Sequence, residues 1–441
     1  MSIENVDYRN GFKLVFQKNK FSETTTINIF VKVGSINEPQ HLRGFSHFLE
    51  HMVFKGNDKY KTHNEISEHF DSIGAYFNAY TTYDHTCYIV KSNSDYFEKN
   101  LDILSHMLLK SIFKKDEFHR EKTVVVDEIN RIRDNNEEYV NEKIYEILFN
   151  GSSYQNSIGG DEHQIMKYNI LSGKKYYKEF YQPHNMVLSI CSNLDMDQIL
   201  SILENNLLVT TKSNKISMSK NVPKYKIDSY IGRRIGILKR PNLEQTYIAL
   251  GFKVCGKNDK DYYALNLLRI ILAGNMSSIL FINLREKEGI TYSIHIDNSF
   301  FEEFGCFVIL TGVDNSKFIG THDNGALDVI IKSLNFVKSG QLTQNNLDIA
   351  KGYLKGTLSL TNDDTLNVTS YNGLNNLFDL KDKTVNCRNL FKRRYENITL
   401  SDINRIIKKY ITKKTMSSYY IGSNINRNLY NNIVNTENKL I

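Results

Sequence analysis

LRGFSHFLEHMVFKG, residues 42–56, is the stretch of this sequence that says most about its fold and chemistry. Its apolar residues recur at helical spacing, which predicts an amphipathic helix. His47 and His51 are at positions i and i+4, so the helix would project both imidazoles from one face, about one turn from each other. This spacing allows both side chains to bind one zinc ion at ~2.0–2.1 Å.

Glu50 lies between the two histidines, near enough to contact a water at the metal without being a ligand itself. The resulting pattern, HxxEH, is the inverted form of the HExxH metal-binding arrangement, and the chemistry is the same. The chain has 12 histidines. Chance would produce such a pattern in about a few per cent of similar chains, so the motif needs support from elsewhere in the sequence.

Two glutamates further along, Glu121 and Glu128, are candidates for completing the site. They lie in HREKTVVVDEINRIRDNNEE, residues 119–138, and their spacing of two helical turns places them on one helix face. A catalytic zinc ion needs a third protein ligand and an open position. Taken alone, such a pair is more often two solvated glutamates on a helix surface.

Three pairs of segments recur in the same order, which indicates that the chain contains one unit twice. Strand–turn–strand patterns form the first pair, long helices the second, and a helix followed by an apolar strand the third. In the third pair, Ser172 and Ser401 suit the helix N-cap position. The paired segments are residues 11–35 and 232–256, 111–135 and 339–363, and 170–193 and 399–424.

The repeat predicts the fold class and the domain organisation. We expect an α+β fold of two tandem homologous domains, each a mostly antiparallel sheet with helices packed on one face. Residues 1–207 would form the first domain, which carries the metal site, and residues 228–441 the second. The polar, aperiodic stretch between them, residues 208–227, is the predicted linker.

The two copies differ at the candidate metal site. When the two long helix patterns are aligned, Glu121 falls on Ala350 in the second copy. Glu128 falls on Thr357, and the second copy contains no HxxEH. The histidines and the carboxylates are therefore present together in one copy and absent together from the other. A single metal site in a duplicated scaffold would leave this pattern.

The composition restricts the possible partners and the cellular compartment. Hydrophobic residues make up 41% of the 441 residues, and the net charge of +7 comes from scattered Lys and Arg. Nucleic-acid binding would need a concentrated basic patch, so no nucleic-acid partner is expected. Five widely spaced cysteines without a CxxC pair favour buried free thiols in a reducing compartment. Without a signal-peptide pattern or ~18 continuous apolar residues, a cytoplasmic protein with no membrane partner is expected.

The motif HFLEHMVFKG, followed at long range by the glutamate of VVVDEI, resembles the pitrilysin/insulinase family of zinc peptidases. The resemblance is greatest to the mitochondrial processing peptidase-like branch and covers nearly the whole chain. It implies that His47, His51 and Glu128 hold one Zn²⁺ per chain and that Glu50 is the general base. Glu121 would be a supporting acidic residue on the same helix face.

SIGAYFNAYTTYDHTCYIV, residues 72–90, resembles the edge strand of that family. In the family an extended substrate pairs with this strand through main-chain hydrogen bonds, which is β-augmentation. The resemblance makes Asn78, Ala79 and Thr81 candidate substrate-binding residues. Without it, the segment is an ordinary β-hairpin.

LREKEGITYSIHI, residues 284–296, resembles the segment that carries the family's Arg/Tyr pair, here Arg285 and Tyr292. A permanently charged guanidinium and a phenol donor suit a developing oxyanion. An isolated Arg and Tyr are more often ordinary surface residues. In the family, two such halves make one side of a chamber that encloses extended peptides, so a homodimer is expected, with a heterodimer left open. Arg285 and Tyr292 would then serve the zinc of the partner chain.

The sequence therefore predicts a zinc-dependent endopeptidase, with two alternatives. A non-catalytic scaffold subunit of the same fold is the first, although such proteins generally have broken metal motifs. A structural zinc site is the second, but it would have four closed protein ligands, often cysteines. No cysteine lies near either motif.

Overall fold

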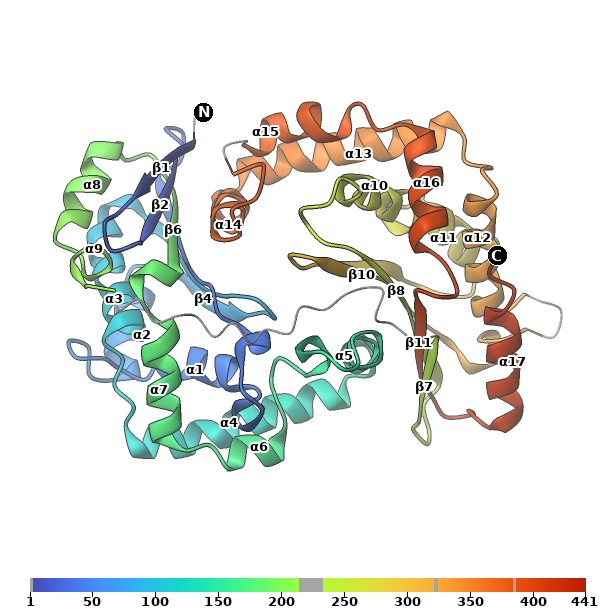
Figure 1. Cartoon of the computed structure of the whole chain (residues 1–441), viewed down its shortest axis with the longest axis horizontal. Helices are drawn as coiled ribbons and strands as arrows, with labels where there is room; N and C mark the ends of the chain where they lie inside the picture. The colour runs from blue at the N-terminus through green and yellow to red at the C-terminus, as the bar shows by residue number, and fades with distance from the viewer. Residues whose placement is uncertain (1–2, 214–232, 321–323, 384–385) are drawn as a thin grey trace. The chain divides into compact units, whose positions relative to one another are not determined.

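A computed structural model describes residues 3–213, 233–320, 324–383 and 386–441. These residues fold into two compact units, shown in Figure 1. Unit 1 comprises the described parts of Met1–Asn130, Asn156–Pro223 and Ser359–Leu390. Unit 2 comprises those of Arg131–Gln155, Lys224–Leu358 and Phe391–Ile441. The predicted linker, residues 208–227, lies largely outside the described residues.

Unit 1 contains a six-stranded sheet with the order β1-β2-β6-β3-β5-β4. The neighbours β2 and β6 run parallel, and the other neighbouring pairs are antiparallel. The strand β4 forms one edge of this sheet. The strands are β1 (Ile3–Asp7), β2 (Lys13–Lys18), β3 (Thr24–Val31), β4 (Tyr76–Thr81), β5 (Thr86–Asn93) and β6 (Met186–Ser192).

Unit 2 contains a five-stranded sheet with the order β7-β11-β8-β10-β9. This order repeats β2-β6-β3-β5-β4 of unit 1, including one parallel pair at the same place, β7 with β11. The predicted α+β fold with two mostly antiparallel sheets is confirmed. The strands are β7 (Arg234–Lys239), β8 (Gln245–Cys255), β9 (Ile294–Phe300), β10 (Phe304–Asp314) and β11 (Met416–Gly422).

Most helices of the first half of the sequence belong to unit 1, and some of them pack on one face of its sheet. α1 packs on β4 and β5, and α3 packs on β5, so that a continuous apolar core fills the space between them. The helices are α1 (Phe45–Val53), α2 (His63–Ser72), α3 (Phe97–Leu109), α4 (Lys115–Asp134), α5 (Asn136–Leu148), α6 (Glu162–Met166), α7 (Ile170–Phe180), α8 (Met196–Glu204) and α9 (Leu207–Thr210).

Helices of the second half follow the same plan. α10 packs on β9 and α16 on β8. The long helices α4 and α13 both have 20 residues, as expected of duplicated elements. The helices are α10 (Tyr262–Ala273), α11 (Ile279–Phe281), the π-helical turn η7 (Ile282–Lys287), α12 (Ala326–Lys338), α13 (Gln344–Asp363), α14 (Thr365–Leu377), α15 (Cys387–Leu390), the π-helical turn η9 (Phe391–Tyr395), α16 (Leu400–Tyr410) and α17 (Arg427–Glu437).

The second face of the unit 1 sheet is covered by α14, a helix from the second half of the sequence. It packs on β3 and β6, and Figure 1 shows it beside the sheet that contains β6. The fit is close, because a Cβ atom at Gly373 would lie 2.2 Å from the Phe30 ring. The hydroxyl oxygens of Thr26 and Thr365 are 2.7 Å apart across this contact.

Unit 2 makes the reciprocal arrangement with α5, a helix from the first half that packs on β8 and β11. A Cβ atom at Gly251 would lie 2.6 Å from the Leu148 side chain. Both faces of each sheet are therefore covered, and the prediction of helices on one face was incomplete. The compact units also cut across the predicted domains 1–207 and 228–441, because each sheet buries its second face under a helix of the other half.

The predicted N-cap serines were wrong. The N-caps of α7 and α16 are Asn169 and Thr399, whose side chains accept backbone N–H groups. Ser172 and Ser401 lie inside the first turn of these helices instead. Asn and Thr are both favoured at the N-cap because each carries a short side-chain oxygen that accepts a backbone N–H group.

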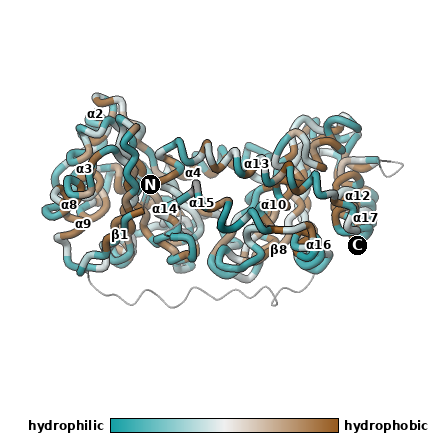
Figure 2. The backbone as a smooth tube through the Cα atoms, turned by 90° about the horizontal axis from the view of Figure 1, so that it is seen from above, coloured by the Kyte–Doolittle hydropathy of each residue, from teal (hydrophilic) through white to brown (hydrophobic). Residues whose placement is uncertain are grey.

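The cysteines agree with the prediction where they are described. Cys87, Cys191, Cys255 and Cys306 are buried free thiols, and the side chain of Cys387 lies outside the described part. Hydrophobic and hydrophilic residues alternate in short stretches along the chain, as Figure 2 shows. Among the described helices, none is both long and apolar enough to cross a membrane.

Candidate metal centre

The helix that carries the histidines, α1, begins at a tightly packed turn. Gly44, its N-cap, has a φ of 87°, and a Cβ atom there would lie 2.5 Å from the Gly160 Cα. Only glycine fits both requirements. The Glu38 carboxylate accepts the backbone N–H groups of Gly44 at 2.6 Å and Ser46 at 2.7 Å. Acceptor oxygens at this end stabilise the helix because the first N–H groups of a helix have no partner within it.

The apolar side of α1 is anchored in the core of unit 1. Phe45 and Phe48 are both fully buried. The Phe45 ring makes edge-on contacts with Tyr168 and Tyr176, at centroid distances of 5.2 and 5.5 Å. The opposite side of the helix, which carries His47 and His51, is only partly buried. Packing therefore fixes which face of α1 the two imidazoles occupy.

The structure brings the three predicted zinc ligands together. The Nε2 atoms of His47 and His51 are 3.3 Å apart. Each Nε2 atom is 3.6 Å from Oε2 of Glu128, which α4 supplies. Four ligands placed tetrahedrally at ~2.0–2.1 Å from zinc are about 3.3 Å from one another. The donor set and its spacing therefore fit a zinc ion, with one position left for a further ligand.

Glu121 lies behind His51. Its Oε1 accepts the Nδ1–H of His51 at 2.8 Å, and its Oε2 is 2.7 Å from Nζ of Lys55. Burial raises the pKa of Glu121, but the hydrogen bonds from His51 and Lys55 outweigh it and hold the pKa below its usual value. With Nδ1 protonated, the lone pair of His51 is on Nε2, which faces the other ligand atoms.

The surroundings shift the pKa values of the two histidines in opposite directions. Burial lowers the pKa of His47 to about 4, and the neighbouring His51 acts in the same direction. Burial also opposes the charged form of His51, but its hydrogen bond to Glu121 and the nearby carboxylates raise the pKa above the usual value. His47 is therefore neutral at physiological pH, which is the form that binds a metal.

Glu50 lies beside the ligand set and is 9% exposed. Burial raises the pKa of its carboxyl group, although a hydrogen bond from Thr81 opposes this shift. The Thr81 hydroxyl donates to Glu50 Oε2 at 2.6 Å. A buried carboxylate whose pKa is raised toward neutrality is suited to accept a proton and then release it.

The strand β4 runs along the edge of the sheet next to α1, as the edge-strand prediction required. Among the described strands, β4 pairs with β5 alone. The backbone N–H of Ala79 donates to Oδ1 of Asn78 at 2.8 Å. The Asn78 side chain therefore covers a main-chain donor on the strand that is predicted to bind substrate.

Arg285 and Tyr292 belong to unit 2, whereas the metal ligands belong to unit 1. Arg285 lies in η7, with its guanidinium carbon 4.9 Å from the Phe281 ring and 4.8 Å from the Tyr292 ring. These cation–π contacts hold the pair together. Tyr292 is 83% exposed, and Gly289 between them has a φ of 56°, as expected of a turn.

Three features of the site were missed by the sequence analysis. Lys55 follows α1 by two residues, and its distance of one helical turn from His51 was the available signal. Glu38 lies in a loop before α1 and carries no local signal. Thr81 was predicted to contact substrate, and nothing in its sequence context pointed to Glu50.

Glu121→Gln is expected to weaken zinc binding by ~10–100-fold, the usual cost of losing the partner of a metal-binding histidine. Gln cannot carry the charge that both His51 and Lys55 require. Competitive titration against a zinc chelator measures the affinity. Glu117→Gln is the control, because Glu117 lies on the same helix and pairs with Arg120 at 3.3 Å. Equal zinc affinity in both variants would contradict the assigned role.

Comparisons with known proteins now identify the family. The sequence pattern of the insulinase family, peptidase family M16, matches residues 13–162. The pattern of the M16 inactive domain matches residues 173–354. An uncharacterized zinc protease of Rickettsia felis is 33% identical over 70% of this chain and 73% of its own. The chain belongs to the insulinase (M16) family.

Two further similar proteins extend the match over most of the chain. The uncharacterized zinc protease YmxG of Bacillus subtilis is 29% identical over 86% of this chain and 88% of its own. The crystal structure of a protease from Helicobacter pylori has a TM-score of 0.84 and 22% identity. It covers 96% of this chain and 100% of its own, and it supports the fold alone.

Proposed function

We propose that this M16 chain is a zinc-dependent endopeptidase that hydrolyses extended peptides. His47, His51 and Glu128 would hold one zinc ion per chain, and Glu50 would act as the general base. The observation that supports this most strongly is the spacing of the three ligand atoms, 3.3–3.6 Å, beside a buried carboxylate. The relatives named zinc proteases support the same class of reaction.

The chemistry divides between the metal and the protein. A bound zinc ion supplies a Lewis acid that acidifies water and polarises the scissile carbonyl. Glu50 takes a proton from the attacking water and passes it to the leaving amine. Glu121 keeps His51 in the tautomer that presents Nε2.

In this proposal, the strand β4 and the Arg/Tyr pair orient the substrate. An extended peptide would pair with the free edge of β4 at Asn78, Ala79 and Thr81 by β-augmentation. To do so it would displace the Asn78 side chain from the N–H of Ala79. Arg285 and Tyr292 would donate hydrogen bonds to the oxyanion.

The alternatives receive no specific support. A scaffold subunit would not need the ligand spacing, the Glu121–His51 hydrogen bond and a buried Glu50 all together. A structural zinc site would have four closed ligands. Within the described residues, the set of three that could hold a metal contains no cysteine. A cytoplasmic location stays a prediction.

Incubation of the purified protein with a mixed peptide library tests the proposed function. Mass spectrometry of the products maps the cleavage sites and so defines the preference. We expect cleavage of internal peptide bonds that stops when zinc is chelated. Cleavage at an unchanged rate in the chelator would overturn the metallopeptidase proposal.

We also propose a homodimer in which Arg285 and Tyr292 serve the zinc site of the partner chain. Glu50→Gln and Arg285→Ala/Tyr292→Phe would each be inactive alone. When equal amounts exchange subunits, about a quarter of the wild-type rate should return, because half of the dimers would contain one intact site. Light scattering and a tag-exchange assay would establish the dimer and its exchange.

The mixing result has a clear contrary outcome. If the subunits exchange and the rate stays at the level of the separate variants, the pair acts within its own chain or has no part in catalysis. A monomer at the assay concentration contradicts the homodimer directly.

A further inference from the structure

We propose that Thr81 is a positioning residue for the general base, and that its hydroxyl group holds the Glu50 carboxylate in a reactive orientation. This inference rests on the proposed role of Glu50. The main chain of Thr81 stays a candidate for pairing with substrate, as do Asn78 and Ala79, and the side chain receives this separate role.

The contact between the two residues is short and has a definite direction. Thr81 Oγ1 lies 2.6 Å from Glu50 Oε2, within the range of a hydroxyl–carboxylate hydrogen bond. A carboxylate can only accept, so the hydroxyl donates. The bond fixes the position of Oε2 of Glu50. This carboxylate is 9% exposed, and the next residue in the sequence is the proposed zinc ligand His51.

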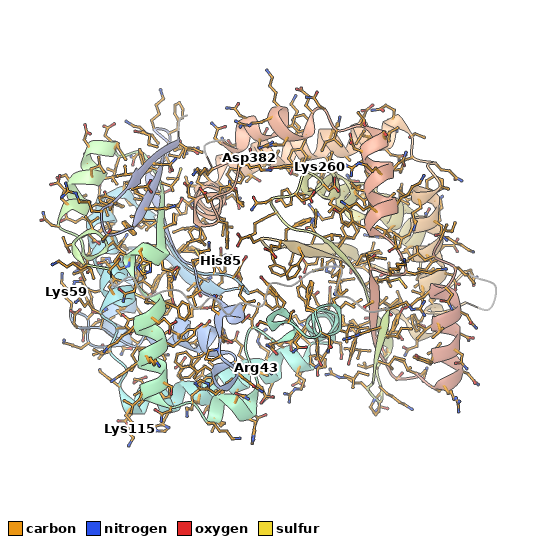
Figure 3. All side chains as sticks on the ribbon, in the orientation of Figure 1. Arg43, Lys59, His85, Lys115, Lys260 and Asp382 are labelled. Atoms are coloured by element: carbon orange, nitrogen blue, oxygen red, sulfur yellow. The ribbon has the colours of Figure 1, made fainter. Side chains whose placement is uncertain are left out.

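The strand end that carries Thr81 is itself fixed. Thr81 is the last residue of β4 and is paired with Thr86 of β5. The turn between the strands is closed by the N–H of Thr82, which donates to the carbonyl of His85 at 2.8 Å. Nδ1 of His85, labelled in Figure 3, is 2.9 Å from the Thr82 hydroxyl and 2.7 Å from Asp84. The hydroxyl of Thr81 therefore projects from a rigid hairpin end.

The geometry separates the functions of the main chain and the side chain of Thr81. A threonine hydroxyl has one hydrogen to donate, and here Glu50 receives it. The same hydrogen cannot bind a substrate carbonyl at the same time. Losing the hydroxyl should therefore slow proton transfer, which lowers kcat, and leave ground-state binding, which contributes to KM, nearly unchanged.

Three threonine variants test this assignment. Thr81→Val removes the hydroxyl and keeps the shape, and we expect kcat to fall ~10–100-fold with KM within about twofold of the parent. Thr81→Ser keeps the hydroxyl and should restore most of the rate. Thr86→Val is the matched control, because Thr86 is buried on the paired strand and donates to the Val33 carbonyl at 2.9 Å. Its kcat should match the parent, and zinc content should be the same in all three.

Each outcome separates this inference from the proposed function. If the parent cleaves peptides with zinc and Thr81→Val keeps its kcat, the inference alone is overturned. A raised KM with an unchanged kcat would show that the side chain binds substrate instead. A Thr81→Ser protein as slow as Thr81→Val would show that the methyl group, and not the hydroxyl, matters. If the parent has no zinc-dependent cleavage, the proposed function and this inference both fail.

Discussion

Glu50→Gln is expected to lower kcat for peptide hydrolysis by ~10²–10⁴-fold, the usual contribution of a general base. Glutamine matches the shape of glutamate but cannot take the proton of the attacking water. Because Glu50 lies outside the ligand set, the variant should still bind one zinc ion per chain. Steady-state kinetics beside elemental analysis of the same sample measures both quantities.

A matched carboxylate variant controls for changes in charge. Glu68 is exposed on the neighbouring helix α2, so Glu68→Gln should keep the parent rate. Full activity in Glu50→Gln would end the assignment of Glu50 as base. Loss of zinc from Glu50→Gln would instead show that this carboxylate helps to hold the metal.

The second large effect is a loss of zinc affinity, expected when Glu128, the proposed ligand on α4, is replaced. Glu128→Gln replaces an anionic ligand by a neutral amide and leaves the two histidines to hold the ion. Loss of a ligand itself should cost more than the ~10–100-fold typical of its supporting partners. We therefore expect zinc affinity to fall by more than ~100-fold, and cleavage to disappear at limiting zinc.

Asp127→Asn is the control for this effect, since Asp127 is the preceding residue on α4 and is exposed. It removes one negative charge at nearly the same place. If Glu128→Gln binds zinc as tightly as Asp127→Asn does, Glu128 is not a ligand. Its negative charge then acts no differently from that of the neighbouring carboxylate on the helix.

Local periodicity predicted the parts of the site that lie on single helices. His47 and His51 share a face of α1 because they are four residues apart. Glu121 and Glu128 share a face of α4 for the same reason. The alignment of Ala350 with Glu121 was also predictable, because α13 has the length of α4 and places buried Ala350 where α4 places Glu121.

Contacts between distant segments could not be predicted from periodicity. The bond from Thr81 to Glu50 depends on how the edge strand β4 lies against α1, and the sequence around Thr81 reads as an ordinary hairpin. Glu38 caps α1 from a preceding loop. The exchange of α5 and α14 between the halves was likewise invisible, because a helix pattern shows that one face is buried but not which sheet buries it.

The helix starts show a smaller limit of sequence reasoning. At α7, Asn169 and Ser172 are both residue types that favour the N-cap. The pattern selected the serine, whereas the structure uses the asparagine, whose side chain accepts the N–H of Leu171 at 2.8 Å. Propensity alone does not choose between two good caps three residues apart.

We propose that one zinc ion, held by His47, His51 and Glu128, makes this chain a peptidase. The most direct test is to strip the metal from the protein and follow peptide cleavage during stepwise addition of zinc. We expect no cleavage without zinc, a linear rise to one equivalent per chain, and a plateau beyond it. Cleavage by the metal-free protein at the full rate, or no cleavage after one equivalent has bound, would show that this zinc ion is not what makes the chain a peptidase.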